Sequence, residues 1–280
     1  MLHQSNRVET TTRFFLYPNE CKEGFAVRRM FSALIIAFST YSRIPMPQVE
    51  WTDANRRHAM CFFPLVGAVV GAAVALWLRL SLALGFGAFL RGAVAATIPL
   101  LITGGIHMDG FMDTADALAS HQPRERRLEI LKDSHTGAFA VMSAAAYLLV
   151  SAALYAEAGA RDALPLAGVF VLSRALSAAT AVTLPGARAN GMLSGFTRPA
   201  GQRAVLGAAV VFSVLAAVLF WQTGPVCLLC CVLAATLSTW YYRRMALGAF
   251  GGVTGDLAGW FTTVNELLLA FCVVLSGKLC

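Results

Sequence analysis

The stretch TIPLLITGGIHMDGFMDTADAL, residues 97–118, joins an uncharged apolar run to three aspartates. The apolar run is typical of a helix that crosses a membrane, and two glycines follow it directly. Asp109, Asp113 and Asp116 are spaced i, i+4 and i+7, which places their carboxylates on one face of a helix. Negative charge at the end of a membrane-spanning helix is costly, so this cluster indicates a functional site.

The composition supports a membrane protein. Hydrophobic residues make up 58% of the 280 residues and charged residues only 13%, whereas soluble chains carry about 25% charged residues. No stretch is polar enough to form a separate soluble domain. We therefore expect one integral-membrane domain over residues 30–280, preceded by a flexible extension over residues 1–29.

The apolar segments predict an all-α fold, because a bilayer core needs about 20 apolar helical residues per crossing. The segment 30–42 is shorter and is stopped by RIPMP at residues 43–47, since two prolines cannot continue a helix. We expect it to be a re-entrant or interfacial helix. The fold is then a polytopic transmembrane helix bundle with about seven spans, at residues 60–80, 91–107, 138–156, 165–184, 204–221, 226–242 and 261–276.

Basic residues are distributed unequally between the two sets of loops. Twelve of them lie in the loops 43–59, 108–137, 185–203 and 243–260, whereas the opposite loops contain only Arg161 and Lys278. Loops rich in Lys and Arg face the cytoplasm, so the aspartates are predicted to face it too. No basic run is interleaved with aromatic residues, which argues against nucleic-acid binding despite a net charge of +7.

The three aspartates have two explanations. Carboxylates this close repel one another, and a divalent cation such as Mg²⁺ would relieve the repulsion. Alternatively, they form a solvated helix end that complements the helix dipole. Gly104, Gly105 and Gly110 permit a phosphate to approach the backbone, or they mark a break between helices.

Polar residues near the cluster extend the candidate site. His107 is interpreted as a base, a metal ligand or a hydrogen-bonded interfacial histidine. The segment KDSHTGAF, residues 132–139, offers three kinds of contact. Lys132 can bind a phosphate, and Asp133 can bind a metal or accept a proton. Ser134 and Gly137 can contact a substrate. The alternative is a polar helix entry in which Asp133 or Ser134 is the N-cap.

Two more segments carry charge in unusual places. GGVTGDLAG, residues 251–259, places Gly255 and Asp256 in a glycine-rich turn whose backbone N–H groups can face an anion. Glu266 and Arg174 lie inside predicted spans, where a charge needs a partner. They are expected to pair with each other, or Arg174 reaches an aspartate or a substrate phosphate and Glu266 contacts the substrate. Acids, cations and glycine turns at one end together indicate phosphoryl or nucleotidyl transfer.

Several motifs carry a resemblance to a known family. They occur in the family's order from about residue 30 to the C-terminus, and the H-x-D-G-x-x-D-T-x-D core is specific. On them the chain resembles the cobalamin synthase, or adenosylcobinamide-GDP ribazoletransferase, family. The motifs are SRIPMP (42–47), FPLVG (63–67), GGIHMDG (104–110), DTAD (113–116), ILKDSHTG (130–137), Ser173-Arg174 and GVTGD (252–256).

The resemblance implies a Mg²⁺-dependent, multi-pass enzyme of the bacterial inner membrane whose active site faces the cytoplasm. It would join adenosylcobinamide-GDP to α-ribazole, or to α-ribazole 5′-phosphate, and release GMP. The metal ligands would be Asp109, Asp113 and Asp116, with Asp256 as a further ligand. Lys132 and Arg174 would neutralise the leaving group, and His107 or Asp133 would accept the proton. Assembly into a homo-oligomer is compatible with this interpretation.

The chain departs from the family pattern in two places. Two other functions would also account for part of its sequence. Ala117 stands where the family typically has glycine, and residues 1–29 have no counterpart. A CDP-alcohol phosphatidyltransferase would share the metal chemistry, but it has Ala-Arg where this chain has Asp113-Thr114. A cation-coupled transporter would place its acids near the membrane midplane.

Overall fold

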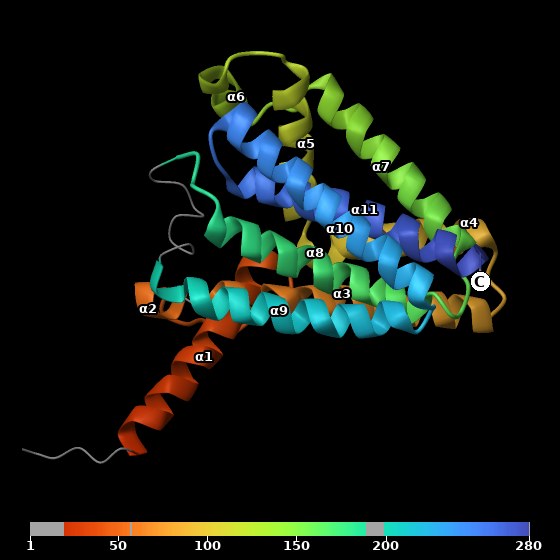
Figure 1. Ribbon diagram of the computed structural model, residues 1–280, viewed down its shortest axis with the longest axis horizontal. Helices are drawn as coiled ribbons and strands as arrows, with labels where there is room; N and C mark the ends of the chain where they lie inside the picture. Colours follow the sequence, from red (N-terminus) through yellow and green to blue (C-terminus); the bar gives the residue numbers. More distant parts are fainter. Residues whose placement is uncertain (1–19, 57, 189–198, 280) are drawn as a thin grey trace, which may run out of the picture.

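The computed structural model describes residues 20–56, 58–188 and 199–279, and these are almost entirely helical. Eight long helices form the body of the molecule (Figure 1). They are α3 (Phe63–Ala83), α4 (Ala88–Thr103), α5 (Ile106–Ala119), α7 (Ala138–Glu157), α8 (Ala163–Thr183), α9 (Pro199–Trp221), α10 (Pro225–Met245) and α11 (Gly255–Leu279). The predicted all-α bundle is therefore confirmed.

In the part of the chain that the structure describes, six helices are long and apolar enough to cross a membrane, and the pair α4 and α5 would make a seventh crossing. The predicted span 91–107 is not one straight helix, because the chain bends by 98° between α4 and α5. Gly104 and Gly105 form the bend with φ of 69° and 81°. Glycine adopts such values with little strain, so the predicted break between helices is confirmed, while the approach of a phosphate to this backbone stays a prediction.

Helix α8 lies at the centre of the bundle. Its most apolar window is 72% buried, whereas that of α7 is only 17% buried and leaves most of its surface for lipid. Gly67 and Gly71 on α3 pack directly against the backbone of Phe170 and Ala167 on α8. Small residues allow such close helix contacts in membranes, where burial away from water no longer drives association.

The N-terminal helix α1 (Glu20–Tyr41) projects from one end of the bundle (Figure 1). It is not among the helices that qualify as membrane spans, in agreement with the expected interfacial segment. It begins ten residues earlier than predicted, so part of the expected extension is helical, and residues 1–19 lie outside the described residues. Ile36 and Ala37 pack against the short helix η1 (Ala59–Phe62).

The loops predicted on the basic side meet at one end of the bundle. Pro185 and Ala187 exchange backbone hydrogen bonds with Val253, and the Arg43 N–H donates to the Ile102 carbonyl at 2.7 Å. The short helices α2 (Asp53–Arg56), α6 (Arg124–Ile130) and the π-helical turn η3 (Ala246–Phe250) belong to these loops. This end of the bundle therefore contains every predicted loop segment of the candidate site.

Candidate active site

Helices α5 and α11 cross in close contact through two glycines. A Cβ on Gly110 would lie 2.6 Å from the Asp256 carbonyl oxygen, and one on Gly259 would lie 3.1 Å from the His107 carbonyl oxygen. The Thr263 hydroxyl donates to the same His107 carbonyl at 3.3 Å. Because the backbones touch, the aspartates of α5 lie beside the first turn of α11.

This contact brings carboxylates from distant parts of the chain together. The Asp113 carboxylate interacts electrostatically with those of Asp109, Asp256 and Asp116. Within the described residues, the side chains of Asp109 and Asp113 have no hydrogen bond and no ion pair. The predicted shared face is thus confirmed, and Asp256 lies next to it.

The acids suit a hard divalent cation, because they offer only oxygen donors and their mutual repulsion is uncompensated. Among the described residues, however, no three Asp, Glu, His or Cys side chains converge on one point that would hold a metal ion. The metal set therefore stays a prediction.

Asp116 has a role that its sequence context does not suggest. Its Oδ2 accepts a hydrogen bond from the Gly137 N–H at 2.7 Å, and its Oδ1 accepts one from the Ala140 N–H at 2.9 Å. These N–H groups belong to the first turn of α7, whose N-cap residue is Gly137. The expected N-cap at Asp133 or Ser134 is therefore wrong, because a carboxylate from α5 satisfies the free N–H groups instead.

The segment with Lys132, Asp133 and Ser134 is an exposed loop between α6 and α7. The His135 ring and backbone N–H hydrogen-bond to Asp133, and these bonds hold the pKa of Asp133 below its usual range. None of the three residues lines the cavities described below. The structure thus ties the loop to α5 through Asp116 without bringing these side chains to a cavity.

The turn before α11 is covered by arginines that the sequence indicates only as loop charges. Gly251 has φ of 72°, and its Cα lies against the Arg124 guanidinium so closely that a Cβ would overlap it. Arg188 donates to the Leu128 carbonyl at 2.6 Å and interacts electrostatically with Asp256. Its buried Nε has no partner among the described residues. Arg188 therefore lies near Asp256, and Arg124 covers the turn that precedes α11.

Two cavities flank Asp109. An open groove of about 470 Å³ runs along the bend and includes Arg43, Gly104, Gly105 and Asp109. A second, more enclosed cavity of about 310 Å³ is also lined by Asp109, together with Gly255 and Asp256. Of the predicted substrate-binding glycines, the structure thus places Gly104, Gly105 and Gly255 at cavity walls, while Gly110 lies in the helix contact.

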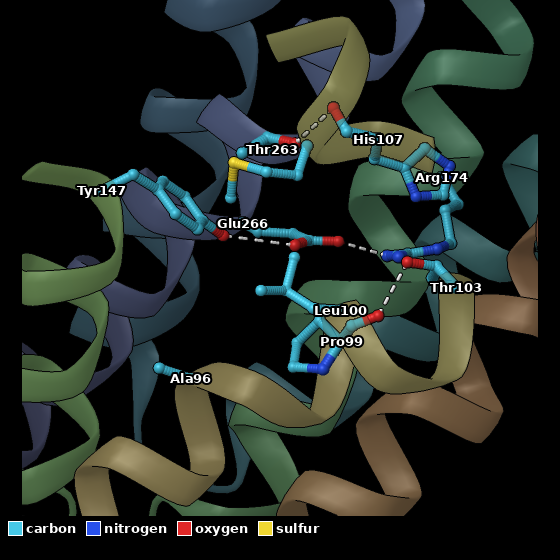
Figure 2. A pocket seen from close by; sticks show the side chains of 10 residues that line it. Ala96, Pro99, Leu100, Thr103, His107, Tyr147, Arg174, Thr263 and Glu266 are labelled. Carbon is cyan, nitrogen blue, oxygen red and sulfur yellow. Dashed lines mark hydrogen bonds and ion pairs between the residues drawn. The ribbon is translucent and has the colours of Figure 1, made fainter. Parts of the chain in front are cut away.

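A buried ion pair lies deeper in the bundle. Arg174 Nη1 donates to Glu266 Oε1 at 2.5 Å, and the Tyr147 hydroxyl donates to Glu266 Oε2 at 3.5 Å (Figure 2). The expected pairing of Arg174 with Glu266 is confirmed. His107 lines the same small space, which holds about 20 Å³, room for about one water. Both His107 ring nitrogens lack a partner in the described part of the chain.

The apolar helices define a multi-pass membrane protein, and the comparisons with known proteins place it among the transferases. The chain belongs to the family described as "Cobalamin-5-phosphate synthase", whose model matches residues 33–274. Curated relatives named adenosylcobinamide-GDP ribazoletransferase extend over most of the chain.

The relative from Lachnoclostridium phytofermentans is 40% identical over 248 residues, 89% of this chain and 95% of its own length. The relative from Desulfitobacterium hafniense is 36% identical over 243 residues, 84% of this chain and 93% of its own. The Ralstonia pickettii relative is 32% identical over 247 residues, 87% of this chain and 95% of its own. No solved structure matches the chain.

Proposed function

We propose that this chain joins adenosylcobinamide-GDP to α-ribazole, or to α-ribazole 5′-phosphate, and releases GMP. The family match supports this reaction over the phosphatidyltransferase and transporter interpretations. The single structural observation that carries the proposal is the contact of Gly110 with the Asp256 backbone. It places unpaired carboxylates of α5 next to Asp256 and the arginines around it.

The reaction is a substitution at phosphorus. A ribose hydroxyl oxygen of the acceptor forms a bond to the cobinamide-linked phosphorus, and the bond from that phosphorus to the bridging oxygen breaks. GMP leaves with the electron pair, and the hydroxyl proton passes to a base. Because charge builds on the oxygens around phosphorus, catalysis depends mainly on positioning and charge neutralisation.

The residues that would hold Mg²⁺ are Asp109, Asp113 and Asp256, whose carboxylates would have to move closer together, because no three acids among the described residues converge on one point in this structure. When bound, the ion neutralises charge on the diphosphate. We leave Asp116 out of this set because each of its oxygens already accepts a hydrogen bond. Its carboxylate positions α7 and the preceding loop relative to α5.

The arginines bind the leaving side of the diphosphate. The Arg188 Nε has no partner among the described residues, and its guanidinium interacts electrostatically with Asp256, while Arg124 covers the turn before α11. Guanidinium groups suit phosphate because their N–H groups form paired bonds to its oxygens. Arg174 is only 1% exposed and engaged with Glu266, so we assign it to the scaffold and not to the leaving group.

His107 is our candidate for the proton acceptor. It lines the enclosed cavity with Asp109, and its ring nitrogens have no partner within the described residues. Lys132, Asp133 and Ser134 lie away from both cavities, and their predicted substrate roles remain to be tested. We further propose that this end of the bundle faces the cytoplasm of the bacterial inner membrane, because the basic loops gather there.

The test is GMP release by the purified full-length protein in detergent micelles. We expect release to require Mg²⁺, adenosylcobinamide-GDP and α-ribazole together. Asp109→Asn should lower the rate at least about a hundredfold, as expected for loss of a group that stabilises transition-state charge. Glu157→Gln, at the opposite end of the bundle, is the control. Full activity of Asp109→Asn, or GMP release without an acceptor, would refute the proposal.

A further inference from the structure

The enclosed cavity has an aromatic wall that the metal and phosphate chemistry does not use. Tyr41 from α1, Met60 from η1 and Phe63 from α3 line it opposite α11. Met60 and Phe63 are 2% and 3% exposed, so they are part of the folded interior. Three segments that precede the acidic helix therefore contribute to the wall of a cavity that Asp109 and Asp256 also line.

The wall is held in place by specific contacts. The Tyr41 and Phe63 rings lie 4.4 Å apart between centroids, and the Phe63 and His107 rings lie 5.5 Å apart. The Tyr41 hydroxyl donates to the Met60 sulfur at 3.3 Å. The aromatic faces are thus set before any ligand enters, which lowers the entropic cost of binding.

The chemistry of the lining selects a flat, uncharged ring. Aromatic side chains stack on heteroaromatic rings, and each such stack contributes about 1–3 kcal/mol. The volume of about 310 Å³ lies at the lower end of the range for small-molecule sites. The carboxylates of Asp109 and Asp256 in the same lining repel a bare phosphate, so the ring side of a ligand belongs at the aromatic wall.

The reaction proposed above offers two such rings, guanine and the benzimidazole of α-ribazole. Guanine carries several polar edge groups, and each costs free energy if it is buried without a partner. The aromatic wall has little to offer them, since the Tyr41 hydroxyl is bonded to Met60 and the Ser177 hydroxyl donates to the Ala258 carbonyl. The other polar groups of the cavity, His107, Asp109 and Asp256, already have roles in the proposed reaction. Benzimidazole has one free ring nitrogen and an otherwise apolar edge.

We propose that the cavity lined by Asp109 and Asp256 binds the benzimidazole base of the acceptor, stacked against Tyr41, whose ring is supported by Phe63. The base then directs its ribose hydroxyls toward the carboxylate end, where the phosphorus would be attacked. This inference rests on the proposed function for the identity of the ligand. It also gives helix α1, which does not qualify as a span, a part in acceptor selection.

The test measures equilibrium binding of α-ribazole to the full-length protein through its benzimidazole fluorescence, without the second substrate. We expect Tyr41→Ala to weaken α-ribazole binding about tenfold or more, the loss of one stacking contact. Tyr41→Phe keeps the ring and should weaken it less. Binding of GMP should stay within about twofold of the original. The matched control is Tyr241→Ala, an aromatic residue that is 53% exposed and lines neither cavity.

The outcomes separate this inference from the proposed function. Unchanged α-ribazole binding in Tyr41→Ala would overturn the inference, even if the protein releases GMP normally. Weakened GMP binding with α-ribazole binding intact would also overturn it and assign the cavity to guanine. Conversely, Tyr41-dependent α-ribazole binding by a protein that releases no GMP would support the cavity assignment and refute only the proposed reaction.

Discussion

Arg174 on α8 and Glu266 on α11 form an ion pair inside the bundle, with 2.5 Å between Nη1 and Oε1. The two residues are 1% and 4% exposed, and Phe63 and Phe170 lie beside the guanidinium. The pair joins the central helix to the helix that carries Asp256. It therefore fixes the position of one wall of the active site from within the core.

Removing one partner should be costly because the other charge is left buried. We expect Glu266→Leu to lower the free energy of unfolding by about 3–5 kcal/mol, and the double variant Arg174→Met with Glu266→Leu to recover a large part of it. Thermal unfolding of the detergent-solubilised protein, followed by tryptophan fluorescence, measures both. A double variant as unstable as Glu266→Leu would contradict the explanation.

Asp116 and Asp109 should respond oppositely to substitution. Asp116→Ala removes the acceptor for two N–H groups of α7, so we expect about 1 kcal/mol lower stability. Asp109 has no hydrogen bond among the described residues, so Asp109→Ala should leave stability nearly unchanged and abolish GMP release. Unfolding and activity measured on the same samples compare the two. An unaltered unfolding temperature for Asp116→Ala would show that the cap is not formed.

Gly110 should tolerate no side chain. A Cβ there would lie 2.6 Å from the Asp256 carbonyl oxygen, so α5 and α11 must move apart in Gly110→Ala. We expect a loss of about 1–3 kcal/mol from overpacking and about a hundredfold lower turnover from the displaced carboxylates. Gly207→Ala is the control, since its Cβ would meet nothing within 4 Å. Normal turnover of Gly110→Ala would mean that the helix contact does not position the acids.

Arg188 should contribute to the use of the nucleotide substrate and not to binding of the acceptor. We expect Arg188→Ala to lower kcat/KM for adenosylcobinamide-GDP by about 10- to 100-fold, the value of one or two charge-assisted hydrogen bonds. The KM for α-ribazole should not change. Arg203→Ala removes an exposed arginine near the same end and serves as the control. An effect confined to the α-ribazole KM would contradict the assignment.

The pH profile should not depend on Asp133. Hydrogen bonds from His135 lower the pKa of Asp133. Its carboxylate therefore stays ionised at neutral pH and becomes protonated only at a pH below the range that is usual for aspartate. The stability that the pair of Asp133 and His135 contributes is present at neutral pH and is lost only as the pH falls through the lowered pKa. We therefore expect Asp133→Asn to leave the shape of kcat/KM unchanged from about pH 6 to about pH 9. If Asp133→Asn abolished the fall of kcat/KM on the acidic side of that range, Asp133 would be identified as the base.

The helical class, the approximate spans and the shared face of Asp109 and Asp113 follow from local sequence. These features depend on hydrophobicity and periodicity along the chain, and a helix keeps the i, i+4 relationship wherever it packs. The pairing of Arg174 with Glu266 was also predictable, because a charge inside a span requires an opposite charge. The family motifs pointed to the same residues.

Other features required contacts between distant segments, which no local pattern encodes. The approach of Asp256 to α5 depends on Gly110 and Gly259 facing each other across two helices. The cap from Asp116, the position of Arg188 and the aromatic wall at Tyr41 likewise join residues far apart in the chain. Sequence thus determined which residues carry charge at the membrane surface. Only tertiary packing decided which of them meet, because distance in space is set by the whole bundle.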